Sequence, residues 1–252
     1  MSYNSYTQDD KKWLSRIEDL SDASAAQKTP KFTKFCDERL LYVFNERAPK
    51  SKDCRILIWG GFEESERAVI GFFPDFIEPD SSMFPISLLK ITGASGLSHR
   101  DFLGSLLGLG INRDMIGDIL VSEDLCYVFV YDTIKDFVLL NLIKVASKHV
   151  SVCEEDSISA LPPKKYEELR GTVSSVRLDC VVSLLARKSR SDTQNLISSE
   201  RVFLNHSVCT SSSAKLKEND VISVRGFGKA RLVAICEETR KGRIRIILNK
   251  YV

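Results

Sequence analysis

The sequence predicts an α+β protein in which N-terminal helices, a middle α/β domain and a small C-terminal α+β domain follow one another. Apolar residues recur at helical spacing near the N-terminus, strand-like and helix-like runs then alternate, and two short helices precede several strands at the end. Charge also divides the chain. Residues 164–252 hold 18 Lys or Arg against 9 Asp or Glu, a net charge of +9, whereas residues 1–163 hold 18 against 25, a net charge of −7. A division of this size indicates that the C-terminal part meets a polyanion.

Residues 1–54 are expected to form an N-terminal helical region. In residues 8–20 the apolar side chains fall on one helical stripe. A second helix is expected to begin with Thr29 as its N-cap and Pro30 at its first position, and to end before Pro49. We expect the apolar stripes of both helices to pack in the core rather than to bind a partner.

Residues 55–156 are expected to form the middle domain. The expected strands are residues 55–62, 67–74, 84–93, 117–121, 125–132 and 150–153, and the expected helices are residues 98–110 and 134–148. From the third strand onward the order is β-α-β-β-α-β, the split βαβ plan of ferredoxin-like and RRM-like domains. The first two strands are expected to add a hairpin at one edge of this sheet.

Residues 157–175, which contain a double proline and several serines, are expected to link the middle domain to residues 176–252. The C-terminal domain should begin with helices over 177–187 and 190–198. Ser189 is the expected N-cap of the second helix, with Asp192 completing a variant of the capping box. Strands follow at "RVFLN", "DVISVRGFG", "ARLVAIC" and "RIRIILNKY".

Composition excludes several classes of protein. No apolar run approaches the length of roughly 18 to 20 residues that a membrane-spanning helix needs, and the polar start of the chain lacks the apolar core of a secretory signal. The seven cysteines include no C-x-x-C pair, a pattern typical of reduced thiols. We therefore expect a cytoplasmic protein without a metal site or a cofactor.

Several motifs of the C-terminal domain keep a fixed order: "RLDCVVSLL", "SRSDTQNLI", "ERVFLN" and "KLKENDVISVRG". Together they resemble the RNA-binding domain first seen in small-subunit ribosomal protein four, here called the S-four domain. Glu200 stands where that domain commonly has a glycine before the strand, and His206 replaces the glycine after Asn205. Neither departure breaks the overall match.

The resemblance and the net charge predict a set of RNA-binding side chains. Arginine presents a planar fork that suits phosphate oxygens, and Asn or Gln can contact sugar hydroxyls or base edges. We expect recognition mainly of the RNA backbone and its shape. The predicted RNA-binding residues are Arg177, Lys188, Arg190, Gln194, Arg201, Asn205, Lys215 and Arg225.

The triplet Arg177-Leu178-Asp179 also suggests an RNA-modifying enzyme, because pseudouridine synthases carry a nucleophilic aspartate in such a triplet. Those enzymes usually have a glycine before the triplet and a threonine after it, and this chain has neither. The sequence favours a structural role for Asp179, as a carboxylate at a helix start paired with an arginine.

The stretch "GASGLSHRDFLGSLLGLGINRDMIGDILV" (93–121) contains no phosphate-binding glycine motif. It resembles a signature of the middle domain of the YlmH family, bacterial S-four proteins whose genes lie beside those for cell division. With the downstream S-four motifs, the resemblance covers essentially the whole chain. It implies association with the ribosome, on large subunits stalled with peptidyl-tRNA, where such proteins hold the tRNA during quality control.

The middle domain has two features of its own. Tyr127, Phe129 and Tyr131 alternate along one strand, as stacking aromatics do in RNA-recognition motifs. Because the region is acidic, we expect this face to be packed or covered. His99 and Arg100, at a helix start, are candidates for a secondary polar site.

The sequence therefore predicts a non-enzymatic RNA-binding protein whose partners are rRNA or tRNA and the large ribosomal subunit. The acidic N-terminal and middle domains could recruit a protein, and no membrane is expected as a partner. Three alternatives remain open: a cell-division or scaffold protein acting through the middle domain, an RNA-modifying enzyme, and a DNA-binding helix pair.

Overall fold

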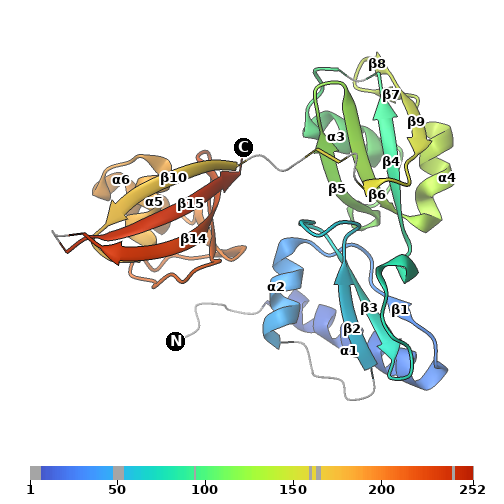
Figure 1. Ribbon diagram of the computed structural model, residues 1–252, viewed down its shortest axis with the longest axis horizontal. Helices are drawn as coiled ribbons and strands as arrows, with labels where there is room; N and C mark the ends of the chain where they lie inside the picture. Colours follow the sequence, from blue (N-terminus) through green and yellow to red (C-terminus); the bar gives the residue numbers. More distant parts are fainter. Residues whose placement is uncertain are drawn as a thin grey trace. The chain divides into compact units, whose positions relative to one another are not determined.

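The computed structural model describes residues 7–47, 54–93, 95–158, 161–162, 166–239 and 242–251. The chain divides into two compact units, one formed by Tyr6–Pro163 and one built on Lys164–Val252 (Figure 1). No helix among the described residues is long and apolar enough to span a membrane. The division into two units follows the division of charge along the sequence.

The first unit begins with two helices and a small antiparallel sheet of order β1-β3-β2. Its elements are α1 (Gln8–Gln27), β1 (Lys31–Phe32), α2 (Glu38–Arg47), β2 (Cys54–Trp59) and β3 (Val69–Pro74). The prediction of a helix start at Thr29 is wrong. The chain after Thr29 is extended because β1 pairs with β3, and α2 begins later, where the Asp37 carboxylate accepts a hydrogen bond from the amide of Leu40 at 2.9 Å.

The middle part is a four-stranded antiparallel sheet of order β5-β6-β4-β9. Its elements are η1 (Ser81–Met83), β4 (Ile86–Thr92), α3 (His99–Gly108), η2 (Arg113–Met115), β5 (Ile116–Val121), β6 (Leu125–Tyr131), α4 (Asp132–Asn141) and β9 (Ser151–Glu154). This order confirms the predicted split βαβ plan.

Two details of the middle part differ from the prediction. Helix α4 ends at Asn141, not at residue 148, and a hairpin of β7 (Lys144–Val145) and β8 (Lys148–His149) follows it. The predicted edge hairpin is also wrong, because β2 and β3 pair with β1 in a separate sheet. The division of the sequence at residues 54 and 55 stays a prediction.

The four-stranded sheet is covered on both faces. On one face, Phe102 and Leu106 of α3 and Val138 of α4 pack against the strands. On the other face, Phe35 and Val69 of the N-terminal part join the sheet residues in one apolar cluster. The N-terminal part thus serves as a second layer over the sheet.

The C-terminal unit is a six-stranded antiparallel sheet of order β10-β15-β14-β13-β11-β12, with two helices packed against it (Figure 1). Its elements are β10 (Tyr166–Val173), α5 (Leu178–Ala186), α6 (Arg190–Ser198), β11 (Val202–Leu204), β12 (Ser207–Val208), β13 (Val221–Val224), β14 (Gly228–Glu238) and β15 (Ile244–Tyr251). Both predicted helices are confirmed. The assignment of residues 166–173 to a linker is wrong, because β10 pairs with β15 along its whole length.

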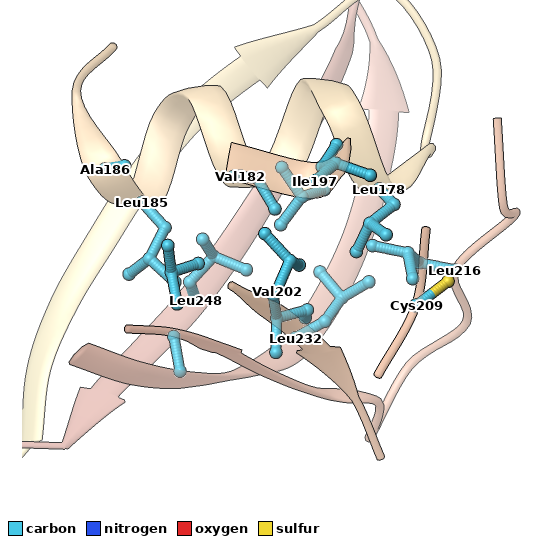
Figure 2. Close-up of a cluster of buried hydrophobic side chains, with 14 of the residues drawn as sticks. Leu178, Val182, Leu185, Ala186, Ile197, Val202, Cys209, Leu216, Leu232 and Leu248 are labelled. Carbon is cyan, nitrogen blue, oxygen red and sulfur yellow. The ribbon is translucent and has the colours of Figure 1, made fainter. Parts of the chain in front are cut away.

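The core of this unit explains why α5 shows one of its faces to solvent. Leu178, Val182 and Leu185 of α5 point toward Leu232 and Leu248 of the sheet (Figure 2). All five are at most 4% exposed. Apolar burial of this kind contributes about 1.5–3 kcal/mol for each side chain, so it fixes the orientation of α5 and leaves its other face available for a site.

Candidate functional site

A groove in the C-terminal unit lies between the end of β10 and the first turns of α5 and α6. Its volume is about 590 Å³. Guanidinium groups, several hydroxyls and a side-chain amide line it, beside a short apolar wall. The lining residues are Thr172, Val173, Ser174, Ser175, Arg177, Asp179, Cys180, Ser183, Leu184, Arg190, Thr193, Gln194 and Arg243. Three of the predicted RNA-binding residues, Arg177, Arg190 and Gln194, therefore meet in one concave place.

The start of α5 settles the role of the Arg-Leu-Asp triplet in the fold. The Nε of Arg177 donates to Oδ1 of Asp179 at 3.1 Å, the amide of Cys180 donates to the same oxygen at 2.9 Å, and Nη2 of Arg177 donates to Oδ2. Partial burial acts to raise the pKa of Asp179, but the hydrogen bonds from Arg177 and Cys180 outweigh it and hold that pKa below its ordinary value. The predicted pairing of Asp179 with an arginine is confirmed, and both carboxylate oxygens are engaged in holding the helix start.

The start of α6 places a cation where a helix does not favour one. The Oγ of Ser189 accepts a hydrogen bond from the amide of Asp192 at 3.2 Å, which confirms the predicted cap. Arg190 is the first residue of the helix and its side chain is exposed. A positive charge at a helix N-terminus opposes the helix dipole, by about 0.3–1 kcal/mol in exposed positions. Helix stability therefore does not account for Arg190.

The next turn of α6 brings two polar side chains to the groove. Thr193 is 1% exposed, and among the described residues its Oγ1 finds no hydrogen-bond partner. A buried polar group left without a partner costs about 1–3 kcal/mol. Gln194 is exposed, so its amide faces solvent. The backbone amide of Thr193 donates to the carbonyl oxygen of Ser189 at 3.0 Å, but among the described residues its side chain is held by packing alone.

Sequence reasoning missed Arg243 and the two serines of the groove. The Nη2 of Arg243 donates to the carbonyl oxygen of Thr172 at 2.6 Å. Arg243 lies just before β15, and only the pairing of β10 with β15 brings it to the groove. The hydroxyls of Ser174 and Ser175 lie 3.6 and 3.7 Å from the Sγ of Cys180. The serines belong to the stretch assigned to a linker, so no local signal marked them.

A second set of predicted cations forms what we call the turn group: Lys188, Arg201 and Arg225. Nη2 of Arg201 donates to the carbonyl oxygen of Arg225 at 2.9 Å, and the amide of Arg225 donates back to the carbonyl oxygen of Arg201 at 2.9 Å. The guanidinium of Arg225 lies 5.0 Å from the centre of the Phe203 ring, and the ammonium of Lys188 lies 5.7 Å from that of Phe227. The turn group lies outside the lining of the groove.

The two remaining predicted residues have different positions. Lys215 is exposed and forms a β-bridge with Arg177, which places it beside the groove. Asn205 has a left-handed backbone with φ of 46°. Its amide nitrogen donates to Asp220 at 2.9 Å, and its amide oxygen accepts a hydrogen bond from the Val221 amide at 2.9 Å. These contacts give Asn205 a structural function, and its contact with RNA stays a prediction.

Replacing Asn205 by alanine is expected to lower the free energy of unfolding of the C-terminal unit by about 1–3 kcal/mol, because the Val221 amide and the buried Asp220 carboxylate each lose a partner. Calorimetric unfolding of the full chain measures the change. Asn195→Ala, on the exposed face of α6, is the matched control and should stay within about 0.5 kcal/mol. A result for Asn205→Ala as small as the control would contradict the structural assignment.

The aromatic face of the middle sheet is closed. Tyr127 and Phe129 are each 2% exposed. The ring of Phe62 stacks on that of Phe129, with centroids 5.2 Å apart and an interplanar angle of 17°. Gly61 has φ of +102° and approaches Phe129 so closely that a Cβ would lie 2.2 Å from the ring. The expectation of a covered face is confirmed, and bases cannot stack on this face.

The polar residues around β5 join the N-terminal layer to the sheet. The Asp118 carboxylate accepts hydrogen bonds from the amides of Glu66 and Arg67 at 2.7 and 3.0 Å. Nε of Arg67 donates to the carbonyl oxygen of Ile116 at 2.9 Å. Burial lowers the pKa of Arg113 to about 10, and the neighbouring Arg67 acts in the same direction. This cluster is a structural clamp between the two layers.

His99 and Arg100, the candidates for a secondary site, are exposed in the first turn of α3. Local desolvation and the nearby Arg113 lower the pKa of His99, whereas Glu66 acts in the opposite direction. Both residues belong to the unit of Tyr6–Pro163, and the groove belongs to the other unit. Their secondary role stays a prediction.

Two family models match separate parts of the chain. Residues 79–159 match the model described as "Putative RNA-binding domain in YlmH", and residues 176–222 match the model described as "S4 domain". The second match contains α5, α6 and most of the predicted S-four motifs. The groove therefore lies largely within the S-four domain.

The whole chain is also similar to a curated protein, "Ribosome-associated protein quality control protein P2" of Bacillus subtilis, with 29% identity over 252 residues, which cover 98% of each chain. The solved structure of "Cell division protein ylmH" from Streptococcus pneumoniae shares the fold, with a TM-score of 0.55 and 22% identity, over 64% of this chain and 100% of that one. With both matched regions present in this order, the chain is similar to the YlmH family of S-four proteins over residues 79–159 and 176–222.

Proposed function

We propose that the chain binds structured RNA through its S-four domain, in association with the ribosome, and that it acts without bond-making chemistry. The observation that carries this proposal is the groove, where Arg177, Arg190 and Arg243 converge from three separate segments of a unit with a net charge of +9. Counterions released when such groups meet phosphates drive binding to RNA of any sequence. A concave site lined by cations also focuses the positive electrostatic field, which attracts phosphate groups to it.

The ribosomal part of the proposal rests on similarity. The B. subtilis relative carries ribosome-associated quality control in its name. We extend this to the present chain as association with the large subunit in the cytoplasm, where it would hold peptidyl-tRNA on stalled subunits. Binding energy from phosphate contacts suffices for such a role, because it requires stabilising a bound geometry and no chemical step.

Co-sedimentation with ribosomal subunits tests the proposal. The wild type is expected to sediment with the large subunit at ~50 mM salt and to dissociate in large part by ~200 mM, because phosphate-led binding falls steeply with salt. The Arg177→Ala/Arg190→Ala variant should lose most of the binding and show a log–log salt slope smaller by roughly two. Free tRNA and duplex DNA as competitors separate RNA recognition from binding to any polyanion.

The control for this experiment is Arg170→Ala. The Arg170 side chain is 75% exposed, pairs with Glu168 on the same strand and does not line the groove. This variant should sediment like the wild type. Equal sedimentation of the wild type and the double variant, or of neither protein, would overturn the assignment of function to the groove.

A second candidate function is a scaffold role for the middle domain, for example in cell division. The observation that favours it is a set of exposed apolar side chains at the end of α4, where Phe137, Leu140 and Ile143 are 45%, 78% and 62% exposed. Large exposed apolar groups in proximity mark protein contacts more often than isolated ones do. A Leu140→Ser/Ile143→Ser variant tests this role. If the variant loses its function in cells but still sediments with ribosomes, the scaffold role is favoured over the ribosomal one.

A further inference from the structure

We infer that the groove holds a single nucleotide turned out of a folded RNA, whose base is recognised by Thr193 and Gln194 while the arginines hold the adjacent phosphates. The inference rests on the proposed RNA-binding function of the same groove and gives it a substrate class. It goes beyond the recognition mainly of backbone and shape that the sequence predicts.

The size of the groove is the first argument. Its volume of about 590 Å³ falls within the range of about 300–1,000 Å³ typical of pockets that enclose whole small molecules. Duplex RNA presents a continuous outer surface and is recognised largely by shape and by backbone contacts. The continuous surface of a duplex cannot fill a concave site of this size, whereas a single unstacked nucleotide can. Sequence-specific recognition of RNA indeed uses loops, bulges and ends with splayed bases.

The chemistry of the lining is the second argument. A groove for phosphate alone needs only cations and hydrogen-bond donors. This groove also holds the Gln194 amide, which both donates and accepts as a base edge does, and an apolar wall that includes Leu184. Leu184 lies against β10 because residue 171 is glycine, where a Cβ would come within 2.5 Å of the leucine side chain.

Thr193 is the third and independent argument. It is 1% exposed, it lines the groove, and its hydroxyl has no partner among the described residues. Nearly all buried polar groups in proteins are hydrogen-bonded, so a buried hydroxyl without a partner calls for a specific cause. Rotation of the Thr193 side chain toward the groove would bring this buried hydroxyl to a polar atom of a base seated there. The distribution of charge in the groove also fits a nucleotide. Asp179 pairs with Arg177, so the positive charges of Arg190 and Arg243 are left to bind phosphates.

The test compares two RNA hairpins with the same stem, one fully paired and one with a single unpaired 2-aminopurine bulge. The full-length wild type is expected to bind the bulged hairpin at least ten times more tightly. The fluorescence of 2-aminopurine should rise on binding, because the base leaves the stack and the described residues that line the groove include no aromatic side chain. Gln194→Ala and the isosteric Thr193→Val should reduce the preference to below threefold, because each variant weakens the binding of the bulged hairpin more than that of the paired one.

Lys215→Ala is the matched control, since Lys215 lies beside the groove without lining it. It should weaken the binding of both hairpins equally. Gln194 is exposed, so Gln194→Ala remains informative even if Thr193→Val disturbs folding. Equal binding of the two hairpins by the wild type, or binding of neither, would contradict the inference that the groove holds an unstacked nucleotide. Sedimentation with ribosomal subunits decides the proposed function separately, so the two failures are distinguishable.

Discussion

Replacing Arg190 by glutamate is expected to weaken RNA binding by roughly 10- to 100-fold while leaving the protein as stable as the wild type or slightly more stable. A hydrogen bond between charged groups contributes about 1.5–3 kcal/mol, and each 1.4 kcal/mol corresponds to about tenfold in affinity. Stability should move in the opposite direction, because Arg190 occupies the first position of α6, where a carboxylate is favoured by about 0.3–1 kcal/mol. Equilibrium binding to ribosomal RNA and thermal unfolding measure the two effects.

The variant is expected to lose RNA affinity without losing stability. Damage to the fold cannot produce this result, because it would lower both. Two charge reversals serve as controls. Arg225→Glu, in the turn group, should weaken binding less than Arg190→Glu because it lies outside the concave site. Arg170→Glu should change the affinity by less than about twofold, as expected for an exposed charge away from the contact surface. If all three reversals weakened binding equally, the domain would be acting through its net charge and the groove would have no special function.

The S-four helices are the part of the fold that the sequence predicts best. Helix α6 spans the predicted residues 190–198, and α5 begins and ends within one residue of its prediction. Their signals are local: a serine cap at Ser189 and apolar residues at helical spacing that face the sheet. The middle sheet is predicted nearly as well, because alternation of strands and helices leaves few possible topologies.

The errors arise where pairing over a long sequence distance overrides local propensity. Residues 31–32 follow a proline and precede apolar residues at helical spacing, yet they pair with Phe72 and Gly71 of β3. Strand β10 lies close to a double proline but pairs with β15 from Tyr166 to Val173. The same pairing brings Arg243 to the groove. The part of the site on the helices was therefore predictable, and the rest depends on contacts that local signals do not encode.

The stretch from Leu97 to Val121 serves the architecture of the first unit. Arg113 donates to the carbonyl oxygen of Ile116 at 2.5 Å, and Asp118 holds the backbone of the N-terminal layer. The aromatic face that this layer covers is the face that RNA-recognition motifs use. A clamp built from this stretch thus keeps the sheet closed to bases, and RNA binding by the S-four groove does not require it to open.

Removing the Asp118 carboxylate is therefore expected to cost about 2–6 kcal/mol of unfolding free energy in the unit of Tyr6–Pro163, because two backbone amides lose their acceptor at about 1–3 kcal/mol each. Asp118 is 9% exposed. Asp118→Ala leaves the amides of Glu66 and Arg67 without this acceptor and removes the negative charge that faces Arg67 and Arg113. Urea unfolding followed by tryptophan fluorescence isolates this unit, because both tryptophans, Trp13 and Trp59, belong to it.

Two further variants separate the contribution of the clamp from that of the apolar packing between the layers. Asp118→Asn keeps one acceptor oxygen and loses the charge, so its unfolding free energy should fall between those of the wild type and Asp118→Ala. Asp124→Ala, in the exposed turn after β5, should shift the free energy by no more than about 0.5 kcal/mol. RNA affinity under folding conditions should be unchanged in all three variants, since the groove belongs to the other unit. A loss below about 1 kcal/mol for Asp118→Ala would mean that apolar packing around Phe129 alone holds the layer on the sheet, and the arginines of the clamp would then be candidates for a functional role.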